Sequence, residues 1–348
     1  MELIEPSPSV LQAFGLDPKE YQHQRTGSGH INQTYLITGK KNFILQRINT
    51  YVFRQPERIA KNIRLAADHL KICHPDYLFL SPIRTQDQKE MFTDESGFPW
   101  RLFPYIDGSI TLNELKQEEE AREAAAGFGK LTANLNGISI QGFEPTIPDF
   151  HNLSWRYEQF QQALQQSTEI TRETAKHTIE KASHYQFLVE EYQQLISRGH
   201  LTERIVHNDT KINNILFSSK TGKALCVIDL DTLMQGYFIY DLGDLVRTCV
   251  SPFSEEESDI SKIVFRKNFY DAVVEGYLSE MNPFLSAGEK EAIPFAGMMV
   301  TYIMALRFLA DFLNGNVYYQ IHYPLQNLVR ATNQLKLVEE IEKNLRPV

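Results

Sequence analysis

Residues 205–217 read Ile-Val-His-Asn-Asp-Thr-Lys-Ile-Asn-Asn-Ile-Leu-Phe, which is an apolar start, a polar loop and a short apolar strand. A polar turn that contains Gly222 leads to a second apolar strand, residues 224–228, and then to Asp229. Two short apolar strands joined by a glycine-containing turn indicate a β-hairpin. The hairpin would bring Asp209, Asn214 and Asp229 to one end of two neighbouring strands.

These three residues have the chemistry that phosphoryl transfer from ATP requires. The acceptor hydroxyl needs a carboxylate to position it and accept its proton, and the phosphates need Mg²⁺, which prefers oxygen ligands. Asp209 would be the catalytic base, and Asn214 and Asp229 would hold the metal. The spacing His-x-Asp-x-x-x-x-Asn, followed by an Asp at a strand end, matches the catalytic and metal-binding pair of protein-kinase-like folds. The alternative is a polar hairpin in which these residues only cap turns.

Three motifs carry a resemblance to a known family. They are residues 207–214, residues 227–232 (Val-Ile-Asp-Leu-Asp-Thr) and residues 240–247 (Tyr-Asp-Leu-Gly-Asp-Leu-Val-Arg). Together they resemble the aminoglycoside phosphotransferase and choline kinase superfamily, and within it most closely the bacterial N-acetylhexosamine 1-kinases. The resemblance implies an α+β, protein-kinase-like bilobal fold, with a small antiparallel-sheet N-terminal lobe and a mainly helical C-terminal lobe. It also implies ATP and Mg²⁺ as cofactors.

The bulk composition limits the partners. The chain has 348 residues, 42% hydrophobic and 23% charged, with a net charge of −9. These values are ordinary for a globular protein, and the acidic balance argues against nucleic acid or a membrane surface as partner. Three cysteines without metal-ligand spacing, and an N-terminus without signal-peptide features, predict a cytoplasmic protein. The apolar run 292–313 is interrupted by Arg307 and Asp311, so it predicts a buried helix. No protein partner is evident.

The N-terminal part carries a Gly-rich turn, Gly27-Ser28-Gly29, before strands near residues 35–37 and 43–48. Such a turn lets backbone amides approach phosphates closely. The string from Gly27 to Tyr35 also resembles the nucleotide loop of the sugar 1-kinases. That resemblance assigns Asn32 and Thr34 to the cofactor site and His30 to the substrate site.

One position departs from the kinase pattern, which has a Lys on the third strand to bind the phosphates. This chain has Gln46 and Arg47 there. We expect Arg47 to contact the phosphates, because it is a permanent cation. Gln46 could face the site instead, because neighbours on a strand point to opposite faces. The alternative is that Arg47 is a surface arginine on an edge strand without a role in the site.

A strand that begins near Phe98 runs into an irregular segment, residues 104–108. In the resembled superfamily such a segment links the lobes and its backbone meets adenine, which assigns Phe103 and Tyr105 to the cofactor site. If the boundary between the lobes lies in this segment, the chain divides into a nucleotide-binding lobe, 1–107, and a catalytic and substrate-binding lobe, 108–348.

A polar, aromatic-rich interruption between C-terminal helices suits a sugar, because Tyr rings pack on its faces and Arg side chains bond its hydroxyls. Arg307, Tyr318, Tyr319 and Arg330 are the candidates, although Arg307 could simply pair with Asp311 one turn later. Asp231 shares a strand face with Asp229, so it would help the metal or orient a substrate hydroxyl. Asp241 would begin and cap a helix, and brace the catalytic loop from behind.

The sequence therefore predicts an ATP-dependent kinase of a sugar hydroxyl, most specifically the anomeric hydroxyl of an N-acetylhexosamine. Two alternatives stay open. The acceptor could be another small alcohol, such as an aminoglycoside or a choline-like or homoserine-like alcohol. The chain could also be a non-catalytic pseudokinase, although such proteins usually lack one of Asp209, Asn214 and Asp229.

Overall fold

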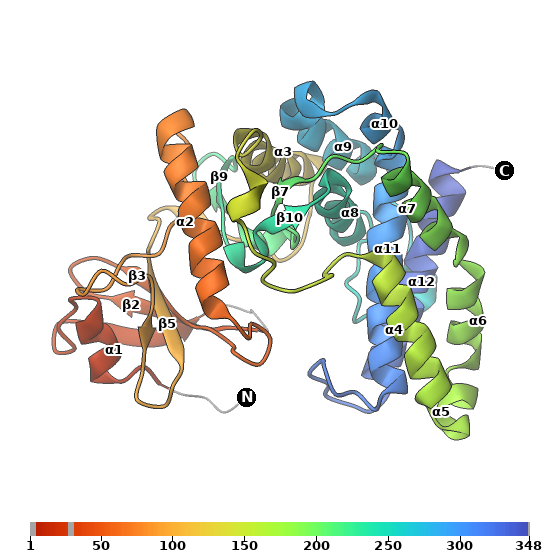
Figure 1. The fold of residues 1–348 in the computed structure, drawn as a ribbon, viewed down its shortest axis with the longest axis horizontal. Coiled ribbons are helices and arrows are strands. Elements are labelled where there is room, and N and C mark those ends of the chain that lie inside the picture. The colour runs from red at the N-terminus through yellow and green to blue at the C-terminus, as the bar shows by residue number, and fades with distance from the viewer. Residues whose placement is uncertain (1–4, 27–30, 347–348) are drawn as a thin grey trace.

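The computed structural model describes residues 5–26 and 31–346. Its N-terminal part is built on an antiparallel sheet, seen in red and orange in Figure 1. The strand order is β1-β2-β3-β5-β4. The strands are β1 (Gln22–Thr26), β2 (Gln33–Thr38), β3 (Phe43–Arg47), β4 (Phe92–Thr93) and β5 (Pro99–Pro104). The predicted N-terminal antiparallel sheet is thus confirmed.

Helix α1 (Pro8–Ala13) covers one face of this sheet. Its Val10 and Leu11 share a core with Leu45, Trp100 and Leu102 of the strands. Because side chains alternate along a strand, residues in phase with Leu45 are buried under α1, and those out of phase project from the other face.

Helix α2 (Pro56–Cys73) follows β3 and begins with proline, whose fixed φ suits a first helical position. Its apolar face, with Ile59, Ile63 and Leu70, belongs to the large core that continues into the C-terminal half. Asn62, in the middle of the helix, donates to Leu233 O at 2.9 Å and to Glu144 O at 2.7 Å. The helix is therefore fixed to the C-terminal half by polar as well as apolar contacts.

The C-terminal half is mainly helical (Figure 1). Its helices are α3 (Glu118–Asn134), α4 (Leu153–Gln166), α5 (Glu169–Thr174), α6 (Lys176–His184), α7 (Phe187–Ser197), α8 (Phe238–Cys249), α9 (Lys267–Met281), α10 (Ala287–Glu291), α11 (Ile293–Leu313) and α12 (Gln326–Leu345). Short 3₁₀ turns are η1 (Ile140–Gly142), η2 (Ile212–Asn214), η3 (Leu230–Thr232), η4 (Ile260–Lys262) and η5 (Asn282–Phe284). Five short strands accompany them: β6 (Ser109–Ile110), β7 (Arg204–Val206), β8 (Ile215–Ser218), β9 (Ala224–Val227) and β10 (Met234–Gly236).

Helix α11 is the central element of the helical half, where it packs against α4, α8 and α12. It is long and apolar enough to cross a membrane by length and composition, but 78% of its most apolar window is buried inside the structure. A helix that is apolar all round is a core helix when it is enclosed in this way. Gly243 on α8 allows the close approach of α11, because a Cβ there would collide with the carbonyl of Ala296. The predicted buried helix is confirmed.

Candidate functional site

The predicted hairpin exists. Strands β8 and β9 pair antiparallel with Ile215 opposite Val227, and β7 pairs with β10 beside them. The loop between β7 and η2 carries the His-x-Asp segment. Asn208 turns this loop with a left-handed φ of 67°, which Asn tolerates better than most residues, and its Nδ2 donates to Thr232 O at 2.9 Å.

Asn214 and Asp209 are brought into direct contact, as their spacing predicts. Asn214 Nδ2 donates to Asp209 Oδ2 and to Asp209 O, both at 2.9 Å. This fixes the orientation of the amide and leaves Asn214 Oδ1 turned away from Asp209. An amide oxygen that is free of this contact is a suitable ligand for a hard divalent cation.

Asp229 lies two residues after the end of β9, directly before η3, and has a left-handed conformation with φ 58°. The backbone of the preceding residue is anchored at both of its polar atoms: Ile228 N donates to Asn214 O at 2.8 Å, and His207 Nε2 lies 2.9 Å from Ile228 O. Desolvation by the surrounding protein atoms, together with the charges of Asp231 and Asp209, raises the pKa of Asp229 to about 7. Asn214 and Asp229 lie at the same end of the paired strands β8 and β9, and amide and carboxylate oxygens are the ligands that Mg²⁺ prefers, so these two residues fit a magnesium ion.

The proposed base is held in its ionised form. Burial alone would raise the pKa of Asp209, but the charges of Lys211 and His207 and the hydrogen bond from Asn214 outweigh it, so this pKa lies below its ordinary value. Lys211 Nζ is 3.0 Å from Asp209 Oδ1, and both side chains remain partly exposed. Asp209 is therefore a charged, positioned acceptor at neutral pH.

Helix α8 packs against the loop of residues 207–211, which carries Asp209 and which we call the catalytic loop. The buried carboxylate of Asp241 accepts from His207 N at 3.0 Å and from Asn208 N at 2.7 Å, while Thr210 Oγ1 donates to Asp241 O at 2.7 Å. The predicted brace is confirmed, but Asp241 is not the helix cap, because α8 already begins at Phe238.

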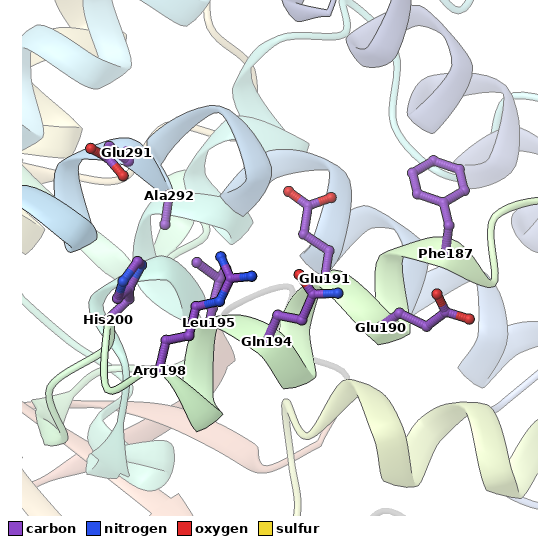
Figure 2. Close-up of a pocket in the computed structure, with 9 residues that line it drawn as sticks. All are labelled: Phe187, Glu190, Glu191, Gln194, Leu195, Arg198, His200, Glu291 and Ala292. Carbon is purple, nitrogen blue, oxygen red and sulfur yellow. The ribbon is translucent and has the colours of Figure 1, made fainter.

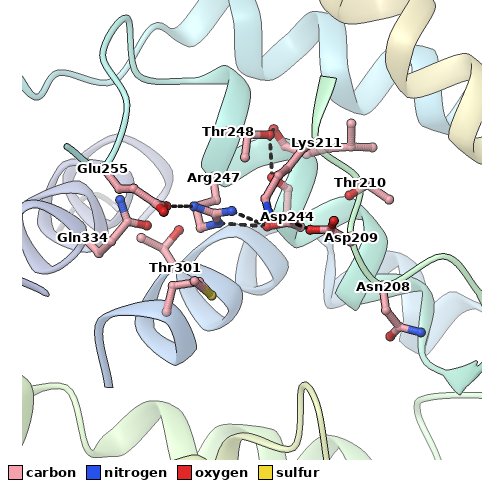
Figure 3. Close-up of polar contacts among 12 residues, drawn as sticks. Asn208, Asp209, Thr210, Lys211, Asp244, Arg247, Thr248, Glu255, Thr301 and Gln334 are labelled. Carbon is pink, nitrogen blue, oxygen red and sulfur yellow. Dashed lines mark hydrogen bonds and ion pairs between the residues drawn. The ribbon is translucent and has the colours of Figure 1, made fainter. Parts of the chain in front are cut away.

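One turn further along α8, Asp244 lies beside Asp209 and Lys211 in Figure 3. It accepts from Arg247 Nε at 2.8 Å, and Arg247 Nη1 in turn donates to Glu255 at 2.7 Å. This buried network connects the catalytic loop with the segment that follows α8.

The sheet meets the catalytic loop through the face that α1 does not cover. Arg101 of β5 lies 2.5 Å from Asp231 Oδ1, and Asn32 Nδ2 donates to Asp231 Oδ2 at 2.7 Å. Thr34 and Gln46 lie on the same face and are hydrogen-bonded at 3.2 Å. Asp231 therefore bonds the N-terminal sheet, and its predicted contact with substrate stays a prediction.

Arg47 is not on this face. It is in phase with Leu45, is 2% exposed, and its guanidinium lies over the Phe98 ring at 4.2 Å. The expectation that Arg47 reaches the phosphates is therefore at odds with the structure, because the strand's alternation directs it away from the catalytic loop.

The predicted acceptor residues fall into two groups. Arg307 lies 4.9 Å from the Phe150 ring and 5.6 Å from the Tyr319 ring, and Tyr318 and Tyr319 contact each other edge to face. Asp311 does not pair with Arg307; it accepts from the backbone N–H groups of residues 317–319. Asp311 thus shapes the loop that carries both tyrosines.

Arg330 is held elsewhere. Its Nε donates to Glu256 Oε1 at 2.6 Å, and its guanidinium lies over the Phe308 ring. Phe308 in turn contacts Tyr319 with ring centroids 4.8 Å apart, so Arg330 lies behind the tyrosine loop. A carboxylate already neutralises it, and its substrate role stays a prediction.

Sequence reasoning missed Arg156, which lies in a polar helix without a distinguishing signal. Its Nε and Nη2 donate to Phe150 O at 3.1 and 3.0 Å. Burial and the nearby charge of Arg307 lower the pKa of Arg156 to about 10. Neither guanidinium has a carboxylate partner among the residues that the structure describes.

The cluster of Arg156, Arg307 and Phe150 adjoins the catalytic loop through His151. His151 follows Phe150, and its Nε2 is 2.7 Å from Asn208 O, one residue before the proposed base.

Several predicted residues remain without a contact that assigns a role. Phe103 and Tyr105 lie at the end of β5, where Tyr105 N donates to Asn42 O at 3.3 Å. Gly27, Ser28, Gly29 and His30 lie outside the described residues.

A surface hollow of about 450 Å³ lies elsewhere, between α7 and the start of α11 (Figure 2). Glu190, Glu191, Arg198 and His200 are among the side chains that line it. None of the predicted site residues that the structure describes lines this hollow, so it is not the catalytic centre.

The site has the parts of a protein-kinase-like phosphotransferase centre. Asn214 fixes the carboxylate of Asp209, Asp229 follows the next strand, and the N-terminal sheet contacts the same region through Asp231. Residues 23–283 match the model of the phosphotransferase enzyme family (APH), and the chain belongs to this family. The narrower resemblance to N-acetylhexosamine 1-kinases stays a prediction.

Solved structures of small-molecule kinases are similar over nearly their whole length. A spectinomycin phosphotransferase in complex with ADP and spectinomycin has 14% identity and a TM-score of 0.62, covering 97% of both chains. An aminoglycoside phosphotransferase from Alicyclobacillus acidocaldarius has 11% identity and a TM-score of 0.67, covering 100% of this chain and 98% of the other. An amicoumacin kinase in complex with AMP-PNP, Ca²⁺ and Ami has 13% identity and a TM-score of 0.61, covering 97% of this chain and 93% of the other. The predicted kinase-like α+β fold is confirmed.

Proposed function

We propose that this chain transfers the terminal phosphoryl group of MgATP to a sugar hydroxyl, specifically the anomeric hydroxyl of N-acetylglucosamine or N-acetylgalactosamine. The product would be a sugar 1-phosphate. The observation that carries the proposal is the ionised Asp209, fixed between Asn214 and Lys211 and next to Asp229. Similar structures bound to ADP or to AMP-PNP with Ca²⁺ support a nucleotide and a divalent cation.

In this proposal Asp209 accepts a hydrogen bond from the acceptor hydroxyl and takes its proton as the oxygen bonds to the terminal phosphorus, while the bond from that phosphorus to the bridging oxygen breaks and ADP leaves. Lys211 keeps the carboxylate in place. Asn214 Oδ1 and Asp229 would hold Mg²⁺, which neutralises charge on the phosphates when it is bound. The carboxylate thus orients the nucleophile, and the metal ligands orient the donor.

We place the boundary between the two lobes after β5, where the chain leaves the N-terminal sheet. Strand β5 ends at Pro104, whereas β6 pairs with β8 of the catalytic hairpin. We assign residues 1–107 to nucleotide binding and residues 108–348 to catalysis and acceptor binding. Phe103 and Tyr105, at the crossing, would border the adenine.

The acceptor assignment depends on the charge near Asn208. Arg156 and Arg307 have no carboxylate partner within residues 5–26 and 31–346, so a cationic acceptor placed between them would be repelled. A neutral acceptor that presents hydroxyl and carbonyl oxygens would instead accept their hydrogen bonds. Tyr318 and Tyr319 add aromatic faces for a sugar ring, and the Tyr319 hydroxyl is buried without a hydrogen-bond partner among the described residues. These features favour an N-acetylated sugar over an aminoglycoside.

A panel of acceptors tests both levels of the proposal. N-acetylglucosamine, N-acetylgalactosamine, glucose, choline and an aminoglycoside are incubated with MgATP, and the product is identified by its phosphorus NMR spectrum. Phosphate should appear on the anomeric oxygen of the N-acetylated sugars. Phosphate on a 6-hydroxyl, or only on choline or the aminoglycoside, would reject the 1-kinase assignment but keep the phosphotransferase.

Replacement of the base tests the mechanism. General base catalysis contributes roughly 10² to 10⁴-fold, so Asp209→Asn should lose about that factor in kcat with a smaller change in KM. Asp271→Asn, an exposed aspartate on α9, is the matched control and should keep full activity. Full activity of Asp209→Asn would remove the assigned base. Absence of both MgATP binding and turnover in the wild type would favour a pseudokinase.

A further inference from the structure

The phosphate-binding cation of a kinase-like sheet should project from the face that meets the catalytic loop. The strand register shows which residues share that face. In the pair β3–β5, Gln46 lies opposite Arg101, and Arg47 lies opposite Trp100. Cross-strand partners point to the same side of a sheet, so Gln46 and Arg101 occupy one face and Arg47 and Trp100 the other.

The face of Arg47 is filled by the core under α1. Trp100 is fully buried there with Leu45 and Leu102, and the Arg47 guanidinium lies over the Phe98 ring at 4.2 Å. To reach the catalytic loop, Arg47 would have to pass through the sheet. The residue in the expected place, Gln46, carries no charge.

Arg101 supplies a charge on the correct face. Its Nε and Nη2 donate to Gln46 Oε1 at 3.1 and 2.8 Å, and its Nη1 lies 2.5 Å from Asp231 Oδ1. Gln46 Nε2 donates in turn to Thr34, so the amide is fixed and holds the guanidinium in one direction. Asp231 is two residues beyond Asp229, which places this cation next to the proposed metal site.

The Arg101 guanidinium also has N–H donors that make no hydrogen bond to the described part of the chain. It carries five N–H donors, and two of its nitrogens are used by Gln46. Nη1 is buried, faces Asp231, and makes no hydrogen bond of good geometry within the described part of the chain. A planar fork of donors matches phosphate oxygens and can bind two of them at once.

We propose that Arg101 on β5 is the cation that binds the nucleotide phosphates, in place of the third-strand lysine of kinases. Gln46 orients it, and Asp231 is its partner when no nucleotide is bound. The proposal rests on the proposed function, because it assumes that a nucleotide occupies the space between the sheet and the catalytic loop. It explains how a chain with glutamine at the expected position keeps a phosphate-binding charge.

Calorimetric binding of MgADP and of adenosine tests the proposal, because only MgADP carries phosphates. A hydrogen bond to a charged group is worth roughly 10- to 100-fold in affinity, so Arg101→Gln should weaken MgADP by about that factor. Adenosine binding should stay unchanged. Arg101→Lys, which keeps the charge, should recover part of the MgADP affinity, and KM for ATP should rise more than KM for the acceptor.

Arg64→Gln is the matched control, because it removes a half-buried arginine that pairs with Glu90 in the same part of the chain. It should leave both affinities as in the wild type. Unchanged MgADP binding in Arg101→Gln would overturn the proposal, and so would an equal loss of MgADP and adenosine, which would indicate a merely structural ion pair with Asp231. A wild-type protein that binds neither compound would overturn the proposed function as well.

Discussion

The catalytic loop depends on one buried carboxylate, and Asp241→Asn tests this dependence with the smallest change of shape. Asp241 is fully buried and accepts from two consecutive backbone N–H groups, those of His207 and Asn208. An asparagine can keep only one of these bonds, because its other atom is itself a donor. The N–H group that loses its bond, of His207 or of Asn208, would then face the side-chain NH₂ group of the new asparagine, one or two residues before Asp209.

The size of the effect follows from these contacts. A hydrogen bond to a charged group contributes about 1.5–3 kcal/mol, and the bond that remains would become a weaker neutral one. Part of this loss is offset, because burial raises the pKa of Asp241 and an amide avoids the cost of burying a charge. We expect a net loss of about 1–3 kcal/mol in the free energy of unfolding.

Thermal unfolding would detect this loss. With an unfolding entropy of about 2.1 cal/mol/K per residue, a chain of 348 residues should lose about 1.5–4 °C in Tm. Turnover should fall further, because a misplacement of about 1 Å near the reacting atoms can cost roughly 10²-fold. KM for the nucleotide should change less than kcat.

Asp271→Asn serves again as the control, because this aspartate is exposed and its pair with Lys267 lies on the surface of α9. Its Tm and kcat should match the wild type. A lower Tm with unchanged kcat in Asp241→Asn would show that the loop keeps its shape without the brace. Unchanged values of both would refute the reasoning about the two backbone bonds.

Three further predictions address the metal, the acceptor loop and pH. Asp229→Ala, or removal of divalent metal with a chelator, should abolish turnover; the variant's Tm in metal-free buffer should not fall, because Asp229 is exposed and is repelled by the charges of Asp231 and Asp209. Asp311→Asn should raise KM for the acceptor but not for ATP, because Asp311 holds the backbone of residues 317–319. Burial lowers the pKa of His151 from 6.5 to about 4. The unfolded chain therefore binds the proton more tightly, and the free energy of unfolding should decline as pH falls from 6.5 towards 4, by about 2 kcal/mol at pH 5. Chemical unfolding at several pH values, compared with His151→Gln, measures this slope.

The sequence was most informative where chemistry depends on local spacing. Asp209 and Asn214 are five residues apart, so the short loop between them brings the two side chains into contact, and Asp241 on α8 holds this loop in place. The position of Asp229 near Asn214 could also be predicted, because the hairpin of β8 and β9 brings the start of one strand beside the end of the other. The fold class was predictable from the family resemblance that residues 207–214, 227–232 and 240–247 carry, and the hairpin and the alternation in the N-terminal strands agree with it.

Residues whose partners are distant in sequence were not predictable in this way. Arg101 meets Gln46 across two strands and Asp231 across the two halves of the chain. Arg156 approaches Arg307 only because α4 packs against α11. In both cases the side chain is an ordinary arginine in the sequence, and only the packing of distant elements gives it a partner.

The choice between Gln46 and Arg47 shows how one distant element decides a site. A strand offers two faces, and a shift of one residue exchanges them. Helix α1, at the start of the chain, covers one face with Val10 and Leu11, and that face becomes core. Every strand residue in phase with Leu45 is thereby removed from the catalytic loop, whatever its charge. The permanent charge of Arg47 made it the natural candidate, yet position on the sheet outweighs charge, because a cation on the wrong face cannot reach the phosphates.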